Sequence, residues 1–304
     1  CGIGGDLIAL ARAGLDLTGV DRDPLTAAIA RADLDVLGLG DRAVVRTAEV
    51  ETVDRTAFDA VVLDPARRNR RGRVFDPEGY SPPWSFVLDV LAGDACVKTA
   101  PIVPHDLVPD HVEAEWISVR GEVKEAALWS GTLHSGPSRR ATILPADAAD
   151  TATAPEHDSS VSSVRASSLT SDDDPGEAPV SAPGAFVYEP DGAVIRAGLV
   201  TAVAPLIDGA LLHPRIAYLT SDRLVPTPFA TAYAVNDVLP YDLKRLRRLL
   251  RERGVGVLTV KKRGLDLDPD AIRKQLVGKG PATATLIVTR TQTQTVALLV
   301  EPVG

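Results

Sequence analysis

The sequence predicts an α/β protein, with a doubly wound parallel sheet followed by a small α+β domain. Strand and helix patterns alternate over residues 1–145, and a second group of strands and helices fills residues 185–304. Between these parts, residues 146–184 are rich in Ser, Ala, Asp and Pro. The three observations together predict two folded domains, 1–145 and 185–304, joined by a linker at 146–184.

The first domain is predicted from its alternating patterns. Strands are expected at 15–21, 43–48, 58–64 and 94–100, and helices at 23–39 and 81–92. Asp23 is a good N-cap for the first of these helices, with Pro24 at its first position. Such alternation places ligands at the carboxyl ends of parallel strands. Three further strands, expected to be antiparallel at the sheet edge, are predicted at 114–122, 124–131 and 138–145.

The linker and the second domain differ in composition and charge. Residues 146–184 carry one Arg, eight acids and few large apolar side chains, so we expect a disordered segment that cannot offset its ordering entropy. Residues 185–304 carry 16 Lys/Arg and 11 Asp/Glu, a net charge of +5 that favours a polyanionic partner. The elements expected there are a strand-to-helix unit at 186–200, strands at 229–239 and 255–262, helices at 241–254 and 268–277, and a hairpin at 284–301.

Composition excludes several classes of protein. No apolar run approaches the ~18 residues of a membrane span, and the first residues lack the basic flank of a signal peptide. Cys1 and Cys96 provide no disulfide framework, which suits a reducing cytosol and predicts a cytoplasmic protein. The five histidines show no metal-ligand spacing with these cysteines, so no metal site is expected.

The opening segment, CGIGGDLIALA, predicts a glycine-rich turn that leads into a helix. Gly2, Gly4 and Gly5 would let the backbone pass close to a ligand, and a helix N-terminus favours polar or anionic groups. The dinucleotide pattern G-x-G-x-x-G fails because Leu7 occupies its third glycine position. For this segment alone, an ordinary strand-to-helix turn is an equally good interpretation. Because the sequence starts at Cys1 and contains no methionine, we interpret it as a fragment whose first strand is missing.

Acidic residues follow the next two predicted strands. Asp21 ends one strand, where a carboxylate can accept hydrogen bonds from both hydroxyls of a ribose. Glu49 follows the next strand, where it could accept a hydrogen bond from an exocyclic amine such as that of adenine. Each acid alone fits a solvated loop, but the glycine turn and two acids in this order indicate a nucleoside pocket.

The segment FDAVVLDPARRNRRGRVF ends a buried strand on Asp64 and Pro65 and then places five arginines within seven positions. Positive charge of this density can hold nucleic-acid phosphates. A solvated basic loop that binds nothing specific is the alternative.

The order of these motifs resembles that of class I S-adenosylmethionine-dependent methyltransferases, which have a Rossmann-like sheet. The LDPARR segment is similar to the [DN]-P-P-[YFWR] motif of enzymes that methylate exocyclic amines or ring nitrogens, with Ala66 and Arg67 departing from the usual proline and aromatic. The resemblance implies catalytic roles for Asp64, Pro65 and Arg67, with positioning supplying most of the rate. It implies that S-adenosyl-L-methionine contacts Cys1, Gly2, Gly4, Asp6, Asp21, Arg22 and Glu49.

The C-terminal part adds a second resemblance. The segments YEPDGAVIRAGL, AYLTSD and VGVLTVKKRG are similar to bacterial class I methyltransferases with a C-terminal THUMP-like domain. Because THUMP domains deliver structured RNA to a catalytic domain, this resemblance implies an RNA substrate such as tRNA or rRNA. The residues expected to contact RNA are Arg68, Arg70, Arg71, Arg73, Lys261, Lys262 and Arg263. The cations of the helix at 241–254 fit RNA contact or an ordinary soluble helix surface.

Several alternatives remain at the level of the sequence. The protein could be a non-catalytic RNA-binding protein with a vestigial pocket, a DNA or protein methyltransferase, or a dinucleotide-dependent oxidoreductase. Trp84 could lie near a target base or in the core.

Overall fold

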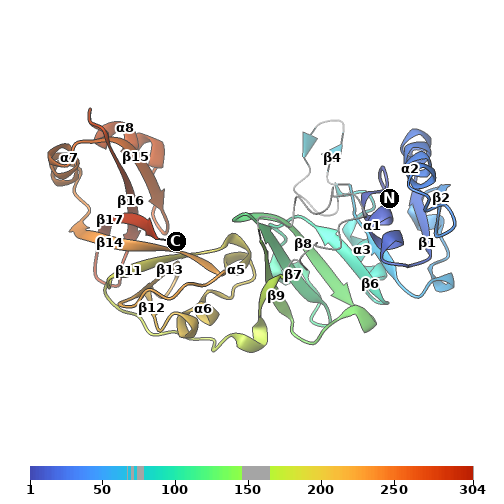
Figure 1. The fold of residues 1–304 in the computed structure, drawn as a ribbon. Helices are drawn as coiled ribbons and strands as arrows, with labels where there is room; N and C mark the ends of the chain where they lie inside the picture. Colours follow the sequence, from blue (N-terminus) through green and yellow to red (C-terminus); the bar gives the residue numbers. More distant parts are fainter. Residues whose placement is uncertain (67, 70–71, 74–78, 146–164, 304) are drawn as a thin grey trace. The chain divides into compact units, whose positions relative to one another are not determined.

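A computed structural model describes residues 1–66, 68–69, 72–73, 79–145 and 165–303 (Figure 1). The chain divides into two compact units. The first contains Cys1–Ala114 and Glu125–Gly136, and the second contains Glu115–Lys124 and Pro137–Gly304.

The secondary structure follows the predicted alternation. The α-helices are α1 (Gly5–Arg12), α2 (Pro24–Val36), α3 (Trp84–Val90), α5 (Gly192–Arg196), α6 (Val200–Leu206), α7 (Leu243–Glu252) and α8 (Pro269–Leu276). Short 3-10 helices are η1 (Val50–Thr52), η2 (Arg55–Ala57), η4 (His105–Leu107), η5 (Gly131–Leu133) and η6 (Ser171–Asp173). None of the described helices is long and apolar enough to cross a membrane.

The strands of the first unit and its boundary are β1 (Leu17–Asp21), β2 (Ala43–Thr47), β3 (Val61–Leu63), β4 (Arg68–Asn69), β5 (Gly72–Arg73), β6 (Ala95–Thr99), β7 (Glu113–Val119) and β8 (Glu122–Ser130). The remaining strands are β9 (Arg139–Leu144), β10 (Ser167–Thr170), β11 (Phe186–Pro190), β12 (Ala210–His213), β13 (Ile216–Ser221), β14 (Ala230–Pro240), β15 (Val255–Lys262), β16 (Ala282–Arg290) and β17 (Thr295–Val303).

Strands β1 and β2 form a parallel pair against which α1 and α2 pack (Figure 1). Leu7 and Leu34 are buried between these elements. A Cβ at Gly19 in β1 would lie 2.9 Å from Leu7 Cδ2, so a larger residue there would displace this buried side chain. As predicted, Asp23 caps α2, its carboxylate accepting hydrogen bonds from the backbone N–H groups of Leu25 and Thr26.

A six-stranded sheet with the order β10-β9-β7-β8-β6-β3 contains the second parallel pair, β3–β6. The antiparallel strands expected at the edge are confirmed for β6–β8 and β9–β10. The α/β class is therefore confirmed, and the described parallel strands of the first unit form two separate ladders, β1–β2 and β3–β6. Among the described residues, β1 pairs only with β2 and β3 only with β6, so each keeps one edge without a partner strand.

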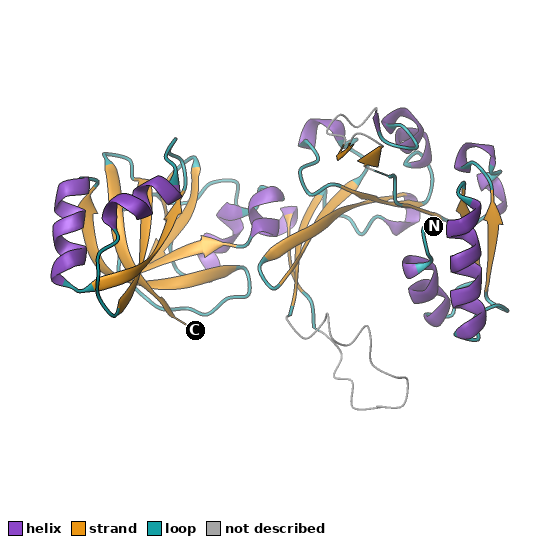
Figure 2. Cartoon of the chain, turned by 90° about the horizontal axis from the view of Figure 1, so that it is seen from above, coloured by secondary structure: helices purple, strands orange, loops and turns teal. Residues whose placement is uncertain are grey.

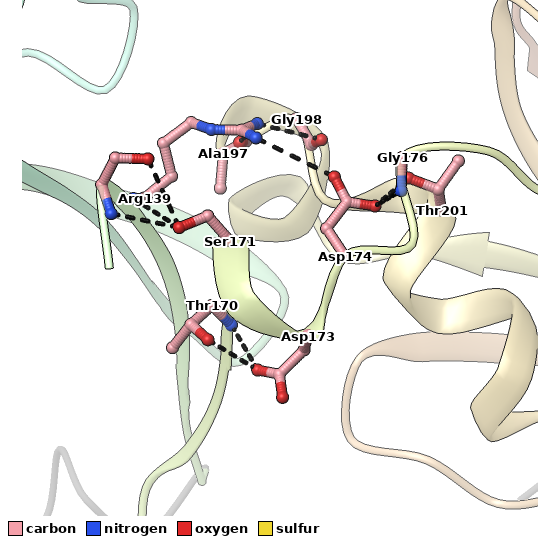
Figure 3. Close-up of polar contacts among 10 residues, drawn as sticks. Arg139, Thr170, Ser171, Asp173, Asp174, Gly176, Ala197, Gly198 and Thr201 are labelled. Carbon is pink, nitrogen blue, oxygen red and sulfur yellow. Dashed lines mark hydrogen bonds and ion pairs between the residues drawn. The ribbon is translucent and has the colours of Figure 1, made fainter. Parts of the chain in front are cut away.

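Residues 146–184 are expected from the sequence to form a disordered linker. Residues 146–164 lie outside the described residues, but residues 165–184 are ordered, which corrects the expectation for this half. Strand β10 pairs antiparallel with β9, and Leu169 is buried. Beyond β10, Asp174 lies 3.9 Å from the Arg139 guanidinium and accepts a hydrogen bond from Thr201 Oγ1 (Figure 3). The Arg139 guanidinium also donates to the Ala197 carbonyl at 2.7 Å. Specific polar contacts thus offset the ordering entropy that the composition alone could not.

The second unit contains a seven-stranded sheet with the order β12-β13-β11-β14-β17-β16-β15. Helices α7 and α8 cover one of its faces (Figure 2), where Leu246 and Ile272 pack against Leu286. On the opposite face, Tyr218 and Ile287 share a second core cluster. Leu286 and Ile287 are consecutive in β16, so their opposite orientations follow from the two-residue period of a strand.

This sheet is strongly curled. Strands β15 and β13 lie near opposite ends of the strand order, yet the Arg263 guanidinium sits 5.4 Å from the centre of the Tyr218 ring. Gly264, at φ +73°, comes so close to β13 that an added Cβ would lie 2.3 Å from Ile216 Cδ1. The end of β15 therefore meets β13 side chains across the face opposite the helices.

Candidate functional site

The glycine turn before α1 has the open backbone that the sequence predicts. Gly2 and Gly4 adopt φ values of +56° and +97°, which favour glycine. A Cβ added at Gly2 or Gly5 would meet no atom within 4 Å, so the backbone there is accessible to a ligand. The Gly4 N–H donates to the Cys1 carbonyl at 3.1 Å, which closes the turn ahead of the helix.

Asp21, at the carboxyl end of β1, is held by this turn. Its Oδ2 accepts a hydrogen bond from the Gly2 N–H at 2.9 Å, and its Oδ1 accepts one from the Asp23 N–H at 2.9 Å. Partial burial works against ionisation, but these two hydrogen bonds keep the pKa of Asp21 below its usual value. Its Oδ1 can still accept a further hydrogen bond, whereas Oδ2 also lies 3.5 Å from the Cys1 nitrogen.

Glu49 follows the neighbouring strand. The parallel register pairs Asp21 with Thr47, and the Ala48 N–H donates to the Asp21 carbonyl at 3.1 Å. Glu49 is exposed at the start of η1, where its side chain makes no capping hydrogen bond. The two predicted acids therefore end adjacent strands at the same edge.

Arg22 contacts a segment that the sequence did not connect with it. Its Nη1 donates to Ser81 Oγ at 3.1 Å. The Ser81 backbone forms a two-way bridge with Ala66, with N···O distances of 2.8 Å and 3.1 Å. Arg22, which directly follows Asp21, is therefore connected through Ser81 to Ala66, which directly follows Asp64 and Pro65.

Asp64 and Pro65 follow β3, Asp64 exposed and Pro65 buried. The parallel register with β6 pairs Leu63 with Val97, so its continuation places Asp64 opposite Lys98. Sequence reasoning missed Lys98, although a lysine near the end of the otherwise apolar strand ACVKT was a usable sign.

Lys98 joins the two halves of the site. Its Nζ donates to Asp6 Oδ1 in α1 at 2.7 Å and lies 3.6 Å from Glu125 Oε2 in β8. Burial works against the Lys98 cation, but the hydrogen bond to Asp6 and the carboxylates of Glu125 and Asp64 raise its pKa. The ammonium therefore stays charged and ties the first turn of α1 to the strand end beside Asp64.

The arginine-rich segment is described only in part. Arg68 and Arg73 occupy opposite backbone positions in the short hairpin β4–β5. The predicted residues Arg67, Arg70 and Arg71 lie outside the described residues. The Ala66–Ser81 bridge joins the described residues that precede and follow residues 67–80. Nearby, Trp84 begins α3 and is buried, as expected for the core alternative.

Two of the predicted C-terminal cations, Lys261 and Arg263, lie beside the carboxylate of Glu189. Lys261 Nζ donates to Glu189 Oε2 at 2.5 Å, and Arg263 Nη2 lies 3.7 Å from Glu189 Oε1. The Tyr218 and Tyr233 rings pack beneath these cations, and burial with the nearby Glu189 carboxylate raises the pKa of Tyr218. Lys262 lies apart, donating to the Leu265 carbonyl at 3.2 Å.

A glycine turn at a helix N-terminus and acids at successive parallel strand ends are typical of α/β enzymes that bind a nucleoside-containing cofactor. No group of three or more His, Cys, Asp or Glu side chains suited to a metal ion occurs in the described ranges.

Similarity to known proteins shows which family the chain belongs to. Two proteins of Mycobacterium tuberculosis, from strains CDC 1551 / Oshkosh and ATCC 25618 / H37Rv, are each 36% identical over 295 residues, covering 95% of this chain and 75% of theirs. Both are named as uncharacterized S-adenosylmethionine-dependent methyltransferases. The chain therefore belongs to the family of S-adenosylmethionine-dependent methyltransferases.

Two further similarities concern the domains. Residues 230–302 match the family model described as THUMP domain-like. A crystal structure of a "putative methyltransferase" from Porphyromonas gingivalis W83 superposes with a TM-score of 0.73 at 21% identity, covering 100% of this chain and 75% of that one. This second likeness shows the fold.

Proposed function

We propose that this methyltransferase transfers a methyl group from S-adenosyl-L-methionine to a nitrogen atom of an RNA base. The observation that carries the proposal is the position of Asp64, which follows β3 opposite Lys98 and connects through Ala66, Ser81 and Arg22 to Asp21. In this proposal Asp21 binds the cofactor and Asp64 accepts the target amine, and hydrogen bonds connect the two chain segments.

The described residues fit this cofactor. Asp21 has free acceptor capacity for ribose hydroxyls, and Glu49 is exposed for an exocyclic amine. The open backbone at Gly2 and Gly5 suits the polar end of the cofactor at the start of α1. Arg22 and Asp6 already have partners in Ser81 and Lys98, so we assign them supporting roles instead of direct contacts.

The cofactor supplies a methyl group on a positive sulfonium, which is an excellent leaving group. The Asp64 carboxylate and the Pro65 carbonyl would accept hydrogen bonds from the target amine and direct its lone pair at the methyl carbon. When bound, the cofactor would supply this methyl group to the nitrogen, the new nitrogen–carbon bond replacing the sulfur–carbon bond, whose electron pair would remain on sulfur. The proton lost from nitrogen passes to Asp64 or to solvent. Positioning supplies most of the rate.

RNA is the acceptor best supported. The THUMP domain-like match covers residues 230–302, and residues 185–304 carry a net charge of +5. The arginines of segment 67–73 would hold phosphates beside Asp64. We place the reaction in the cytoplasm, where the thiols of Cys1 and Cys96 would remain reduced.

The decisive experiment compares Asp64→Ala with Asp59→Ala. Both acids flank β3 and both are exposed, but Asp59 precedes the strand and Asp64 follows it. With labelled cofactor and RNA from cells lacking the gene, Asp64→Ala should lower kcat by about 100-fold or more, because the target amine loses its alignment. Cofactor Kd, measured by calorimetry, should change less than about two-fold in either variant, since Asp64 acts on the acceptor.

Three results would count against the proposal. Full turnover by Asp64→Ala would remove the catalytic assignment. Label appearing only in DNA or protein would replace the acceptor, and binding of NAD instead of S-adenosyl-L-methionine would replace the reaction class. If neither cofactor binds in calorimetry while RNA still binds, the protein is a non-catalytic RNA-binding protein.

A further inference from the structure

We propose that RNA phosphates are held by the outward face of α7, and not by the Lys261–Arg263 pair. This proposal rests on the RNA substrate proposed above and assigns the surface that binds it. The sequence presents two basic groups in residues 185–304, and the structure separates them by environment.

Helix α7 buries one side and exposes the other. Leu246 and Leu250 enter the core beneath the helix. Asp242 caps the helix, its carboxylate accepting hydrogen bonds from the Lys244 and Arg245 N–H groups at 2.8 Å and 2.9 Å. A fixed first turn and a buried leucine side hold the orientation of the polar face.

Three cations form a line along that polar face. Lys244, Arg248 and Arg251 follow the i, i+4, i+7 spacing of one helix side and extend over about 10 Å. All three are exposed, and the Arg248 side chain retains 74% of its accessible surface. We call these three residues the α7 line.

The charges of the α7 line are little compensated. Arg248 lies 3.8 Å from Glu252, an exposed pair that solvent screens strongly. Lys244 and Arg251 form no ion pair within 4 Å in the described part of the chain, and Lys244 has only a Coulombic interaction with the exposed Asp242. Glu252 is the single acid among the ten residues of α7, against five Lys and Arg.

The Lys261–Arg263 pair is already occupied. Both cations share the Glu189 carboxylate, and their side chains retain only 32% and 31% of their accessible surface. A phosphate would have to displace Glu189 and leave a partly buried carboxylate unpaired, which is costly. We infer that this pair fastens the end of β15 to β11 and β13.

Phosphodiester oxygens are the ligands that the α7 line fits best. Guanidinium groups bind them in a bidentate manner, and a lysine adds a point charge. Each phosphate neutralised releases condensed counterions, so the contact can be counted from the salt dependence of binding.

The test measures binding of a fluorescein-labelled single-stranded RNA of 20 nucleotides by the full chain, over a range of salt concentrations and without cofactor. The variant K244Q/R248Q/R251Q removes the α7 line while keeping good helix formers. We expect the slope of log K against log salt to flatten by about 0.7 for each lost contact, about 2 in total.

Two controls separate the local effect from net charge and folding. R165Q/R215Q/R290Q removes three exposed arginines of the same unit outside α7 and should retain the wild-type slope. E189Q/K261Q/R263Q should also keep the slope, while its thermal midpoint falls. Circular dichroism establishes that each variant is folded at the assay temperature.

Each outcome decides the proposal. An unchanged slope for the α7 variant, or an equal loss in the R165Q/R215Q/R290Q control, overturns it. A flattened salt slope for E189Q/K261Q/R263Q would show that the Lys261–Arg263 pair binds RNA phosphates, and it overturns the proposal. Capture of a polyglutamate peptide with no binding of RNA assigns α7 to an acidic protein partner and overturns it as well. Because no cofactor is present, failure of methyl transfer alone leaves these results intact.

Discussion

At the scale of single residues, Asp21 and Arg22 are neighbours in sequence with different tasks. Asp21→Ala should weaken S-adenosyl-L-methionine binding by about 1.5–3 kcal/mol, roughly 10- to 150-fold in Kd, because a charged acceptor is lost. Arg22→Ala should leave Kd nearly unchanged and lower kcat about ten-fold, because Ser81, which is bridged to Ala66 after Asp64, loses its hydrogen bond to the residue that follows Asp21. Calorimetry and single-turnover kinetics measure the two effects.

Controls for both variants are available in the chain. Asp16 precedes β1 and pairs with Arg42 at an exposed position, so Asp16→Ala should leave cofactor affinity unchanged. Ser81→Ala should reproduce the Arg22→Ala defect, and the double variant should be no slower than either single one. Additive losses in the double variant would show that Arg22 acts by another route.

At the scale of secondary-structure elements, the segment after β10 owes its order to a few polar contacts. Asp174→Ala removes the acceptor for Thr201 and the partner of Arg139, both of which lie in the second unit. We expect the free energy of unfolding to fall by about 1–3 kcal/mol, because these groups lose a partly buried partner. Asp172→Ala, at a neighbouring exposed position, should change it by less than about 0.5 kcal/mol. Equal stability of the two variants in urea titrations would contradict this role.

The same elements show what a sequence can predict. Local rules were sufficient for α2, where Asp23 and Pro24 define the start, and for the strands that end on Asp21 and Thr99. They failed for residues 165–184, whose order depends on Arg139 and Thr201, distant in the chain. Composition carries no record of such partners.

The candidate site divides along the same line. Asp21, Glu49 and Asp64 could be chosen because each ends a predicted strand. Lys98 could not be given a partner, because its register against β3 appears only when the strands pair. Glu189 could not be placed beside Lys261 either, because the curl of a seven-stranded sheet brings them together.

At the scale of the whole molecule, the compact units do not follow the boundaries expected from composition. Residues 165–184 contribute a bridge between Val180 and Leu211, and the Leu211 N–H donates to the Pro179 carbonyl at 2.8 Å. A fragment 165–304 should therefore unfold several degrees above a fragment 185–304, as measured by circular dichroism. Equal midpoints would mean that these twenty residues add nothing to the fold of the second unit.

The bridge between Ala66 and Ser81 has a consequence for how this enzyme could change its substrate. It holds the two ends of segment 67–80 together, with Asp64 and Pro65 on one side and the start of α3 on the other. Lengthening a loop with fixed ends costs only about 0.6 kcal/mol for each doubling. Under the proposed function, changes in the length of this arginine-rich insert should therefore alter RNA recognition more than the positions of Asp64 and Pro65.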